Sequence, residues 1–341
     1  MKTIKNSKIF YGWWVVLGCV LITTTMVPPI MSLSNKFLIP VSMMVTNWFV
    51  EKRGIAMSVT MAGIGLGGTI FSPIVTNLLQ NYGWRHTYLI MAGIILVVAL
   101  PVALFVLKKS PEQMGLKAYG AEKQAANNAK QGTKKQGVLI SVKESKTKLF
   151  FLLMIVGMLA NGIINSGALG QFPPALEELH GASVQAAIIS LYSLVGIFGK
   201  IFIGWINDKF GVVVSATYGC IMFGLAFVFM LLGQNTNMLY IMAVVFGFGN
   251  AIGTVIPPLV TSEVFGMEKY PEAYGMVNSA TQVGLSLGSL LVASMYDLNG
   301  SYTLAWMLLL VLTAVTLFSW VGSCLVAKRY MASDVELKQA Q

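Results

Sequence analysis

Charged residues are scarce in this sequence. They make up 11% of its 341 residues, whereas a soluble globular domain carries about 25%. Acidic residues are the rarer sign, with 13 Asp and Glu beside 23 Lys and Arg. Together with a hydrophobic fraction of 56% and a mean hydropathy of +0.72, this scarcity excludes a soluble protein. The net charge of +10 comes from basic residues between apolar runs, where they set membrane topology, so we expect no nucleic-acid partner.

Cysteine and histidine are also rare. The three cysteines, Cys19, Cys220 and Cys324, lie inside apolar runs and have no metal or redox spacing. Glu177-x-x-His180 supplies only half of a metal pattern, because a metal takes three or four ligands. We therefore predict no metal, no cofactor and no enzymatic activity. A membrane enzyme that depends on His180 is the alternative.

Ten apolar runs have the composition of membrane helices. They cover residues 10–33, 37–49, 55–79, 84–107, 149–172, 184–206, 212–232, 238–260, 274–296 and 302–327. The second run is too short, because 13 residues of helix reach only about 20 Å and the hydrocarbon core is about 30 Å thick. The sequence therefore predicts an all-α fold, a polytopic helical membrane protein with about ten spans.

Residues 108–148 divide the chain. This segment is polar, rich in Ala, Asn, Gln and Gly, and holds ten lysines, a composition typical of a flexible linker. By the positive-inside rule we place it in the cytoplasm, together with both termini of a multi-pass protein of the plasma (inner) membrane. We predict an incomplete N-terminal bundle at residues 1–107 and a six-helix C-terminal bundle at residues 149–341.

The two parts share a pattern of small residues. At a constant offset of 221 residues, Gly54, Ser58, Gly63, Leu66 and Gly67 correspond to Gly275, Ser279, Gly284, Leu287 and Gly288. Glycines four residues apart let two helices approach closely, so Gly63, Gly67, Gly284 and Gly288 are predicted helix-packing residues. Repeated halves joined by a basic cytoplasmic linker are typical of a transporter built by duplication.

The halves are unequal in length. From Pro28 to Pro40 is 12 residues, whereas the matching stretch from Pro173 to Pro257 is 84, so the first half is about 72 residues shorter. The gap falls at residues 34–40. Restoring it gives about 413 residues and twelve spans in two sets of six. We infer an internal deletion of about two to three helices from a complete transporter.

One lysine, Lys200, lies well inside an apolar run. Placing a lysine near the centre of a membrane helix costs roughly 2.5 to 3.5 kcal/mol, so it usually faces a watery cavity or a partner. Ser193, Gly196 and Gly204 share its stripe of the helix, which indicates a close-packed or water-lined surface. Two alternatives are that the ammonium reaches the lipid headgroups along its stem, and that it pairs with Asp208.

Three motifs are Gly204-x-x-x-Asp208-Lys209-x-Gly211, Gly63-x-x-x-Gly67 with Pro73, and Tyr11-Gly12-Trp13-Trp14. With these motifs the chain resembles the major facilitator superfamily, and within it the oxalate:formate antiporter-like and monocarboxylate transporter branch. Gly204-x-x-x-Asp208-Lys209-x-Gly211 resembles the conformational-lock motif of that superfamily, although three valines replace the basic residues expected after it. Gly63-x-x-x-Gly67 with Pro73 resembles its fifth-helix glycine-proline motif. The branch is indicated by Tyr11-Gly12-Trp13-Trp14, by Asn47-Trp48-Phe49 with Arg53-Gly54, and by Ser110-Pro111-Glu112-Gln113-Met114-Gly115-Leu116. The resemblance implies a two-bundle architecture whose N-terminal bundle is incomplete here.

The resemblance also implies where the substrate binds. In antiporters of that branch, cations on the eighth and eleventh helices hold the two carboxylates of the substrate. Lys200 matches the first cation, whereas the eleventh helix has Thr281-Gln282 in the corresponding region and no cation. One positive charge suits one carboxylate, so a monocarboxylate or another small organic anion is favoured over oxalate.

Polar side chains of the C-terminal half are expected to line the pathway beside this cation. The predicted substrate-binding residues are Lys200, Tyr192, Asn161, Asn165, Asn250, Asn278 and Gln282. For each amide, the structural alternative is a hydrogen bond between helices, worth about 0.6 kcal/mol on average.

The sequence thus predicts secondary active or facilitative transport of a small organic anion by alternating access, with membrane lipid and the anion as partners and a monomer as the working assembly. No acid lies deep in a span, so we favour exchange (an antiporter) or facilitated diffusion over proton symport. The competing hypothesis is an internally deleted membrane protein that inserts but does not transport.

Overall fold

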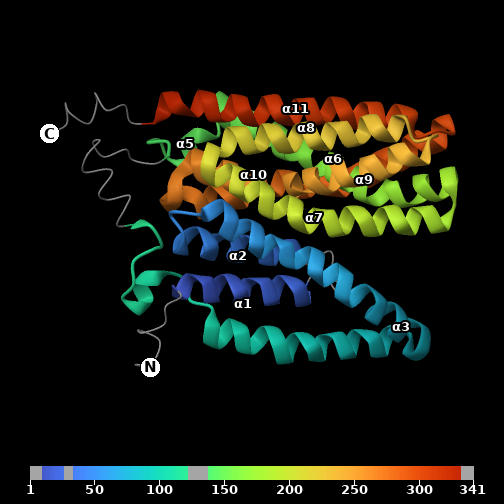
Figure 1. Cartoon of the computed structure of the whole chain (residues 1–341). Coiled ribbons are helices and arrows are strands. Elements are labelled where there is room, and N and C mark those ends of the chain that lie inside the picture. The colour runs from blue at the N-terminus through green and yellow to red at the C-terminus, as the bar shows by residue number, and fades with distance from the viewer. Residues whose placement is uncertain (1–9, 27–33, 122–136, 332–341) are drawn as a thin grey trace. The chain divides into compact units, whose positions relative to one another are not determined.

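Helices make up nearly all of the protein in the computed structural model, which describes residues 10–26, 34–121 and 137–331 (Figure 1). Within these ranges the one β-type pairing is an isolated bridge between Phe49 and Tyr119. Six helices of the described chain are long and apolar enough to cross a membrane. The prediction of an all-α, polytopic membrane protein is confirmed. The chain divides into two compact units, Met1–Gly132 and Thr133–Gln341.

The described part of the first unit contains three α-helices: α1 (Tyr11–Met26), α2 (Ser34–Trp48) and α3 (Arg53–Pro101). The π-helix η2 (Val102–Val106) and the 3-10 helix η3 (Pro111–Met114) follow α3. Gly83 interrupts α3 with φ +68°, a value that glycine adopts without steric cost. The kink divides α3 where the sequence predicts two successive spans, residues 55–79 and 84–107.

Helices α1 and α3 touch at backbone distance. A Cβ atom at Gly67 would collide with the carbonyl oxygen of Thr24, and one at Gly63 would lie 2.8 Å from the Val20 oxygen. Thr23 and Thr24 donate across the same contact to backbone carbonyls of α3, at 3.0 and 3.1 Å. The two glycines therefore lie where small residues are needed. The side chain of Pro73 lies outside the described residues.

The start of the predicted linker is ordered against the first unit. Trp48 Nε1 donates to the Lys108 carbonyl at 2.8 Å, and Asn47 Nδ2 donates to that of Lys109 at 3.1 Å. The ring of Tyr119 lies 5.7 Å from the ring of Phe49, centre to centre. Residues on both sides of the segment 122–136 are thus structured, whereas composition alone predicts a flexible linker over 108–148.

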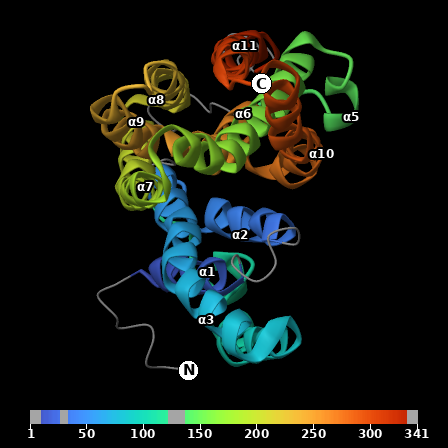
Figure 2. The ribbon, with the colours of Figure 1, turned by 90° about the vertical axis from the view of Figure 1, so that its right-hand side faces the viewer.

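The second unit has more helices in its described part. Its elements are α5 (Val142–Ser145), α6 (Leu149–His180), α7 (Ala182–Phe210), α8 (Val212–Leu231), α9 (Thr236–Gly249), η4 (Asn250–Gly253), α10 (Ile256–Asn299), α11 (Thr303–Ala327) and η5 (Lys328–Tyr330). Figure 2 shows α6 beside α10 and α11, and α7, α8 and α9 grouped together. Gly266, with φ +70°, divides α10 into a short arm and a long span.

Helix α6 is longer than the sequence predicts. Residues 149–172 are the predicted run, but the helix continues through Pro173 and Pro174 to His180. Proline is tolerated inside membrane helices because neighbouring groups satisfy the freed backbone atoms. Beyond the prolines, Gln185 Nε2 of α7 donates to the carbonyl of Pro173 at 3.0 Å and joins α7 to this part of α6.

The end of the linker is held by one lysine. Lys269 Nζ donates to the carbonyls of Val138, Leu139 and Ile140 at 2.7, 3.0 and 3.0 Å. The amide of Val138 donates to the Val264 carbonyl at 2.9 Å. An ammonium has three donor hydrogens, and all three can be used here. The chain that joins the two units is therefore bound beside the Gly266 kink.

We expect Lys269→Met to free this segment. Loss of bonds from a charged donor removes about 1.5 kcal/mol of local stability, which makes local opening roughly tenfold more frequent. Hydrogen exchange of peptides that cover residues 137–141 measures the effect. Lys146→Met removes an exposed lysine nearby and should leave exchange unchanged. Equal exchange in the two variants would show that the lysine does not hold the linker.

Candidate functional site

Lys200 lies in α7 and is buried, with 6% of its surface exposed. Its neighbour Gly199 packs on the backbone of α9, where a Cβ atom would lie 2.7 Å from Phe248 Cα. One turn earlier, a Cβ at Gly196 would lie 3.8 Å from Asn250 Nδ2. This burial argues against a lysine stretched along a lipid-facing surface. The charge is thus kept within protein, as expected for an intramembrane cation with a role.

A pair of buried amides faces inward from α6. Asn161 is 0% and Asn165 is 5% exposed. Asn165 Nδ2 donates to the carbonyl and to the Oδ1 atom of Asn161, at 2.8 and 2.9 Å. Asn161 Nδ2 has no partner although it is buried. A buried donor without an acceptor costs about 1 to 3 kcal/mol, so this atom is suited to bind a ligand or a water molecule.

The helix opposite these amides is broken. The sequence predicts a single span over residues 238–260; within it, η4 and two further residues separate α9 from α10. The cause is Pro257-Pro258, which have no N–H groups for the carbonyls of Gly253 and Thr254. In membrane proteins, backbone of this kind is tolerated where it is buried in protein or lines a cavity.

Gly253 brings the broken segment against the amide pair. A Cβ atom at Gly253 would collide with Oδ1 of Asn165, so only glycine fits there with this side chain in place. Sequence reasoning did not select Gly253. The signal that could have found it is a glycine four residues before a Pro-Pro pair inside an apolar run.

Two buried hydroxyls, those of Thr254 and Thr281, have no hydrogen-bond partner in the described chain. Thr254 Oγ1 directly follows Gly253, and Thr281 Oγ1 lies on α10, whose backbone at that residue touches Gly162 of α6. With Asn161 Nδ2, three elements therefore supply polar atoms that have no protein partner in the described chain. We name Asn161, Asn165, Gly253, Thr254 and Thr281 the amide site.

The other predicted binding residues occupy three helices. Tyr192 of α7 is buried, with 6% of its surface exposed. Its ring packs against the ring of Phe246 of α9, with 5.1 Å between the ring centres. Asn250 begins η4, beside the Lys200 stripe. Asn278 and Gln282 are half-buried on α10, either side of Thr281. Asn161 and Asn165 are the pair of these residues described above as joined by hydrogen bonds.

The predicted lock motif forms the end of α7. Gly204 is buried, Asp208 and Lys209 are exposed, and Gly211 ends the helix with φ +86°. Lys209 Nζ lies 5.0 Å from the centre of the Trp205 ring, a cation–π contact. The motif therefore has a defined local structure.

Gly284-x-Ser286-x-Gly288 matches the nucleophile motif of α/β-hydrolases by letters. That motif requires a sharp turn from a strand to a helix. Ser286 instead lies within α10, and its hydroxyl donates to the Gln282 carbonyl at 3.0 Å. The two glycines serve helix packing, since Cβ atoms there would meet the backbone of α6.

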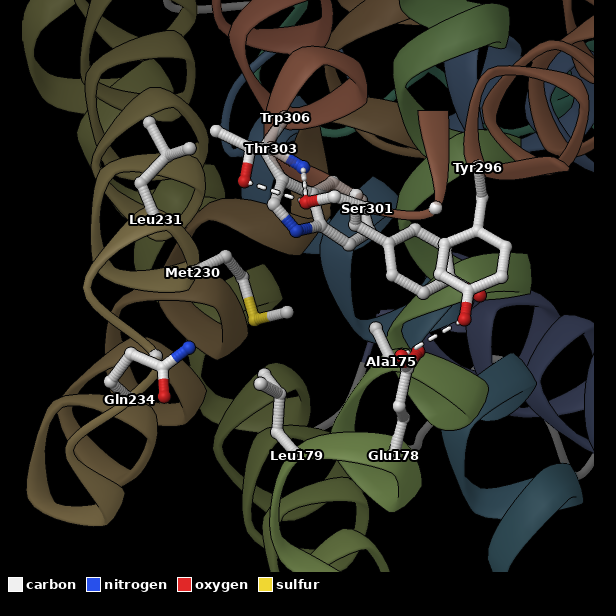
Figure 3. Close-up of a pocket in the computed structure, with 13 residues that line it drawn as sticks. Ala175, Glu178, Leu179, Met230, Leu231, Gln234, Tyr296, Ser301, Thr303 and Trp306 are labelled. Atoms are coloured by element: carbon white, nitrogen blue, oxygen red, sulfur yellow. Dashed lines mark hydrogen bonds between the residues drawn. The ribbon is translucent and has the colours of Figure 1, made fainter. Parts of the chain in front are cut away.

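A hollow that sequence reasoning missed lies between the end of α6, the α8–α9 turn and the α10–α11 turn (Figure 3). Its volume is about 220 Å³. We name it the end pocket; its lining residues are Ala175, Glu178, Leu179, Met230, Leu231, Gly233, Gln234, Tyr296, Gly300, Ser301, Tyr302, Thr303 and Trp306. Three segments that are far apart in the sequence line this pocket, so no local sequence pattern indicates it.

Comparisons with known proteins agree with this architecture. A family model described as Major Facilitator Superfamily matches residues 9–189 and again residues 151–338. Monocarboxylate transporter 12-B of Danio rerio is 26% identical over 311 residues, which cover 82% of this chain and 63% of that protein. An uncharacterized MFS-type transporter, YhjX, of Escherichia coli (strain K12) is 27% identical over 71% of this chain and 56% of its own length.

Among solved structures, the human organic anion transporter MFSD10 has a similar fold, with a TM-score of 0.61 and 14% identity over 91% of this chain and 82% of that chain. At this identity the likeness concerns the fold alone. The chain spans less than two thirds of the length of the curated relatives described above.

Proposed function

Because this chain belongs to the Major Facilitator Superfamily, we propose that it carries a small organic anion of the monocarboxylate class across a membrane by alternating access. The observation that carries the proposal is Lys200, a buried cation inside a membrane-length helix. The name of one curated relative, a monocarboxylate transporter, supports the same class.

The chemistry of the second unit suits one carboxylate. The Lys200 ammonium supplies the positive charge, and the free Nδ2 group of Asn161 supplies a neutral donor. Tyr192, Asn250, Asn278 and Gln282 complete the proposed substrate-binding set. The apolar runs carry no deep acid that would bind a proton, so exchange or facilitated diffusion fits better than proton symport.

The distribution of charge supports an orientation for this multi-pass membrane protein. In the second unit, the C-terminal ends of α7 and α11 and the short arm of α10 lie at the linker end (Figure 1). These parts carry Lys209, Lys269, Lys328 and Arg329. Residues 170–186, 228–240 and 292–306, at the opposite end, contain no Lys or Arg. By the positive-inside rule, the linker end and both termini face the cytoplasm in the plasma (inner) membrane. The proposed arrangement is a monomer with bundles at 1–107 and 149–341.

A second candidate is a membrane protein that inserts without transporting. It is favoured by the 72-residue shortfall between the two halves and by the short coverage of the relatives. Rocking-bundle transport requires two bundles of similar size around the site. The first unit has only α1, α2 and the two arms of α3 in its described part.

Uptake by the purified chain in liposomes tests the proposal. Labelled lactate is the probe, and the matched protein has residues 34–40 replaced by the corresponding segment of a full-length relative. We expect the natural chain to accumulate lactate at least tenfold faster than protein-free liposomes. Equal lactate uptake rates in the two proteins, both above the rate of protein-free liposomes, would exclude the second candidate. Uptake by the restored protein alone would establish it and overturn transport by this chain.

A further inference from the structure

The end pocket is a built cavity separate from Lys200. It lies between the end of α6, the α8–α9 turn and the α10–α11 turn, all within the second unit. At about 220 Å³ it is smaller than the 300 to 1,000 Å³, approximately, of pockets for drug-sized ligands. Its occupant is therefore a small molecule or one end of a larger one.

Apolar and aromatic side chains form the floor of the end pocket. Trp306 and Met230 are each 3% exposed, and the Met230 thioether points into the hollow in Figure 3. The Tyr302 ring stacks on Tyr296 at 4.3 Å and on Trp306 at 5.4 Å. Because neighbouring rings stack on Tyr302, this floor offers an apolar aromatic surface for the body of a ligand, and the ligand's charge must be met elsewhere.

One carboxylate lies on the wall. Glu178 of α6 accepts a hydrogen bond from the hydroxyl of Tyr296 of α10, at 2.9 Å. This bond uses one of about four lone-pair positions on the carboxylate, so the others are available to a ligand. Tyr296 thereby fixes the direction of the charge, while the exposed position of Glu178 keeps it accessible from outside.

The surroundings of the pocket are acidic although the protein is basic. Glu177 and Asp297 flank Glu178 and Tyr296 in the sequence. Residues 170–186, 228–240 and 292–306, which make up this end of the unit, contain no Lys or Arg. An anion would meet a repulsive field here, and a cation an attractive one.

We propose that the end pocket binds a small organic cation, an ammonium group attached to an apolar or aromatic body. The ammonium pairs with Glu178, and the body lies on the Tyr302–Trp306 surface. This chemistry is the opposite of that at Lys200. Both a free amine and the choline or ethanolamine headgroup of a lipid present such a cation.

Calorimetric titration of the purified full chain in a maltoside detergent tests this inference. The probes are phenethylammonium and 3-phenylpropionate, which have similar shapes and opposite charges. We expect phenethylammonium to bind and Glu178→Gln to weaken it at least tenfold. Any binding of 3-phenylpropionate should be unaffected by Glu178→Gln. The matched control, Glu263→Gln, removes an exposed acid from the linker end of α10 and should change nothing.

Two further variants and one further ligand complete the titration. Tyr302→Leu should weaken phenethylammonium severalfold, and Lys200→Ala should not affect it, since that variant changes only the proposed anion site. Titration with glycerophosphocholine in place of the amine shows whether the pocket binds a lipid headgroup or a free amine: tighter binding of glycerophosphocholine indicates the headgroup, and tighter binding of phenethylammonium indicates the amine. No binding at millimolar amine, or equal weakening by Glu178→Gln and Glu263→Gln in proteins with unchanged melting temperatures, would overturn the proposal.

Discussion

A Gly288→Val variant is expected to lose the folded second unit or to melt far below the natural chain. A Cβ atom at Gly288 would collide with the Ile163 carbonyl oxygen of α6 and would lie 2.9 Å from the Gly167 amide nitrogen. Both atoms belong to helix backbone, which cannot move aside as a flexible side chain can. We expect a cost of at least about 3 kcal/mol, the upper range for overpacking.

Gly284 should behave in the same way. Its Cβ would collide with the Leu159 carbonyl oxygen and would lie 3.0 Å from Gly162 Cα, so the two helices meet glycine to glycine. Gly275 is the matched control, because it lies in the same helix and nothing lies within 4 Å of its Cβ position. Thermal unfolding in detergent compares Gly288→Val with Gly275→Val. Similar melting temperatures would show that the contact between α6 and α10 is not as close as described.

Composition and local pattern predicted the helices well. Apolar runs of about 20 residues can satisfy their backbone only as helices in lipid, so fold class followed from length and hydropathy. Glycine spacing located close helix contacts too, since Gly284 and Gly288 repeat Gly63 and Gly67 at a fixed offset and each has a neighbouring backbone within collision distance of a Cβ.

The arrangement of the amide site did not follow from pattern. Residues 238–260 are apolar throughout, so hydropathy predicted one continuous span and gave no sign of the break at η4. The Pro257-Pro258 pair was a local signal for it. The meeting of Gly253 with Asn165, 88 residues earlier, is a tertiary contact, and no spacing rule connects residues so far apart.

Replacing Lys200 with methionine is expected to abolish most anion binding and uptake while the protein stays folded. Methionine keeps a similar unbranched chain and removes the charge. A hydrogen bond from a charged donor contributes about 1.5 to 3 kcal/mol, so lactate binding should weaken roughly ten- to a hundredfold. Lys200→Arg keeps the positive charge with a different donor geometry and should retain part of the activity.

The melting temperature separates a functional from a structural lysine. A buried charge that serves the substrate lowers the stability of the empty protein, so Lys200→Met should melt at the same temperature or higher. A lysine that completes a structural ion pair gives the reverse, a lower melting temperature with lactate binding unchanged. Lys146→Met removes an exposed charge outside α7 and outside the proposed binding set, and it should alter neither quantity. Unchanged lactate binding in Lys200→Met would remove the ammonium from the proposed site, whatever the stability.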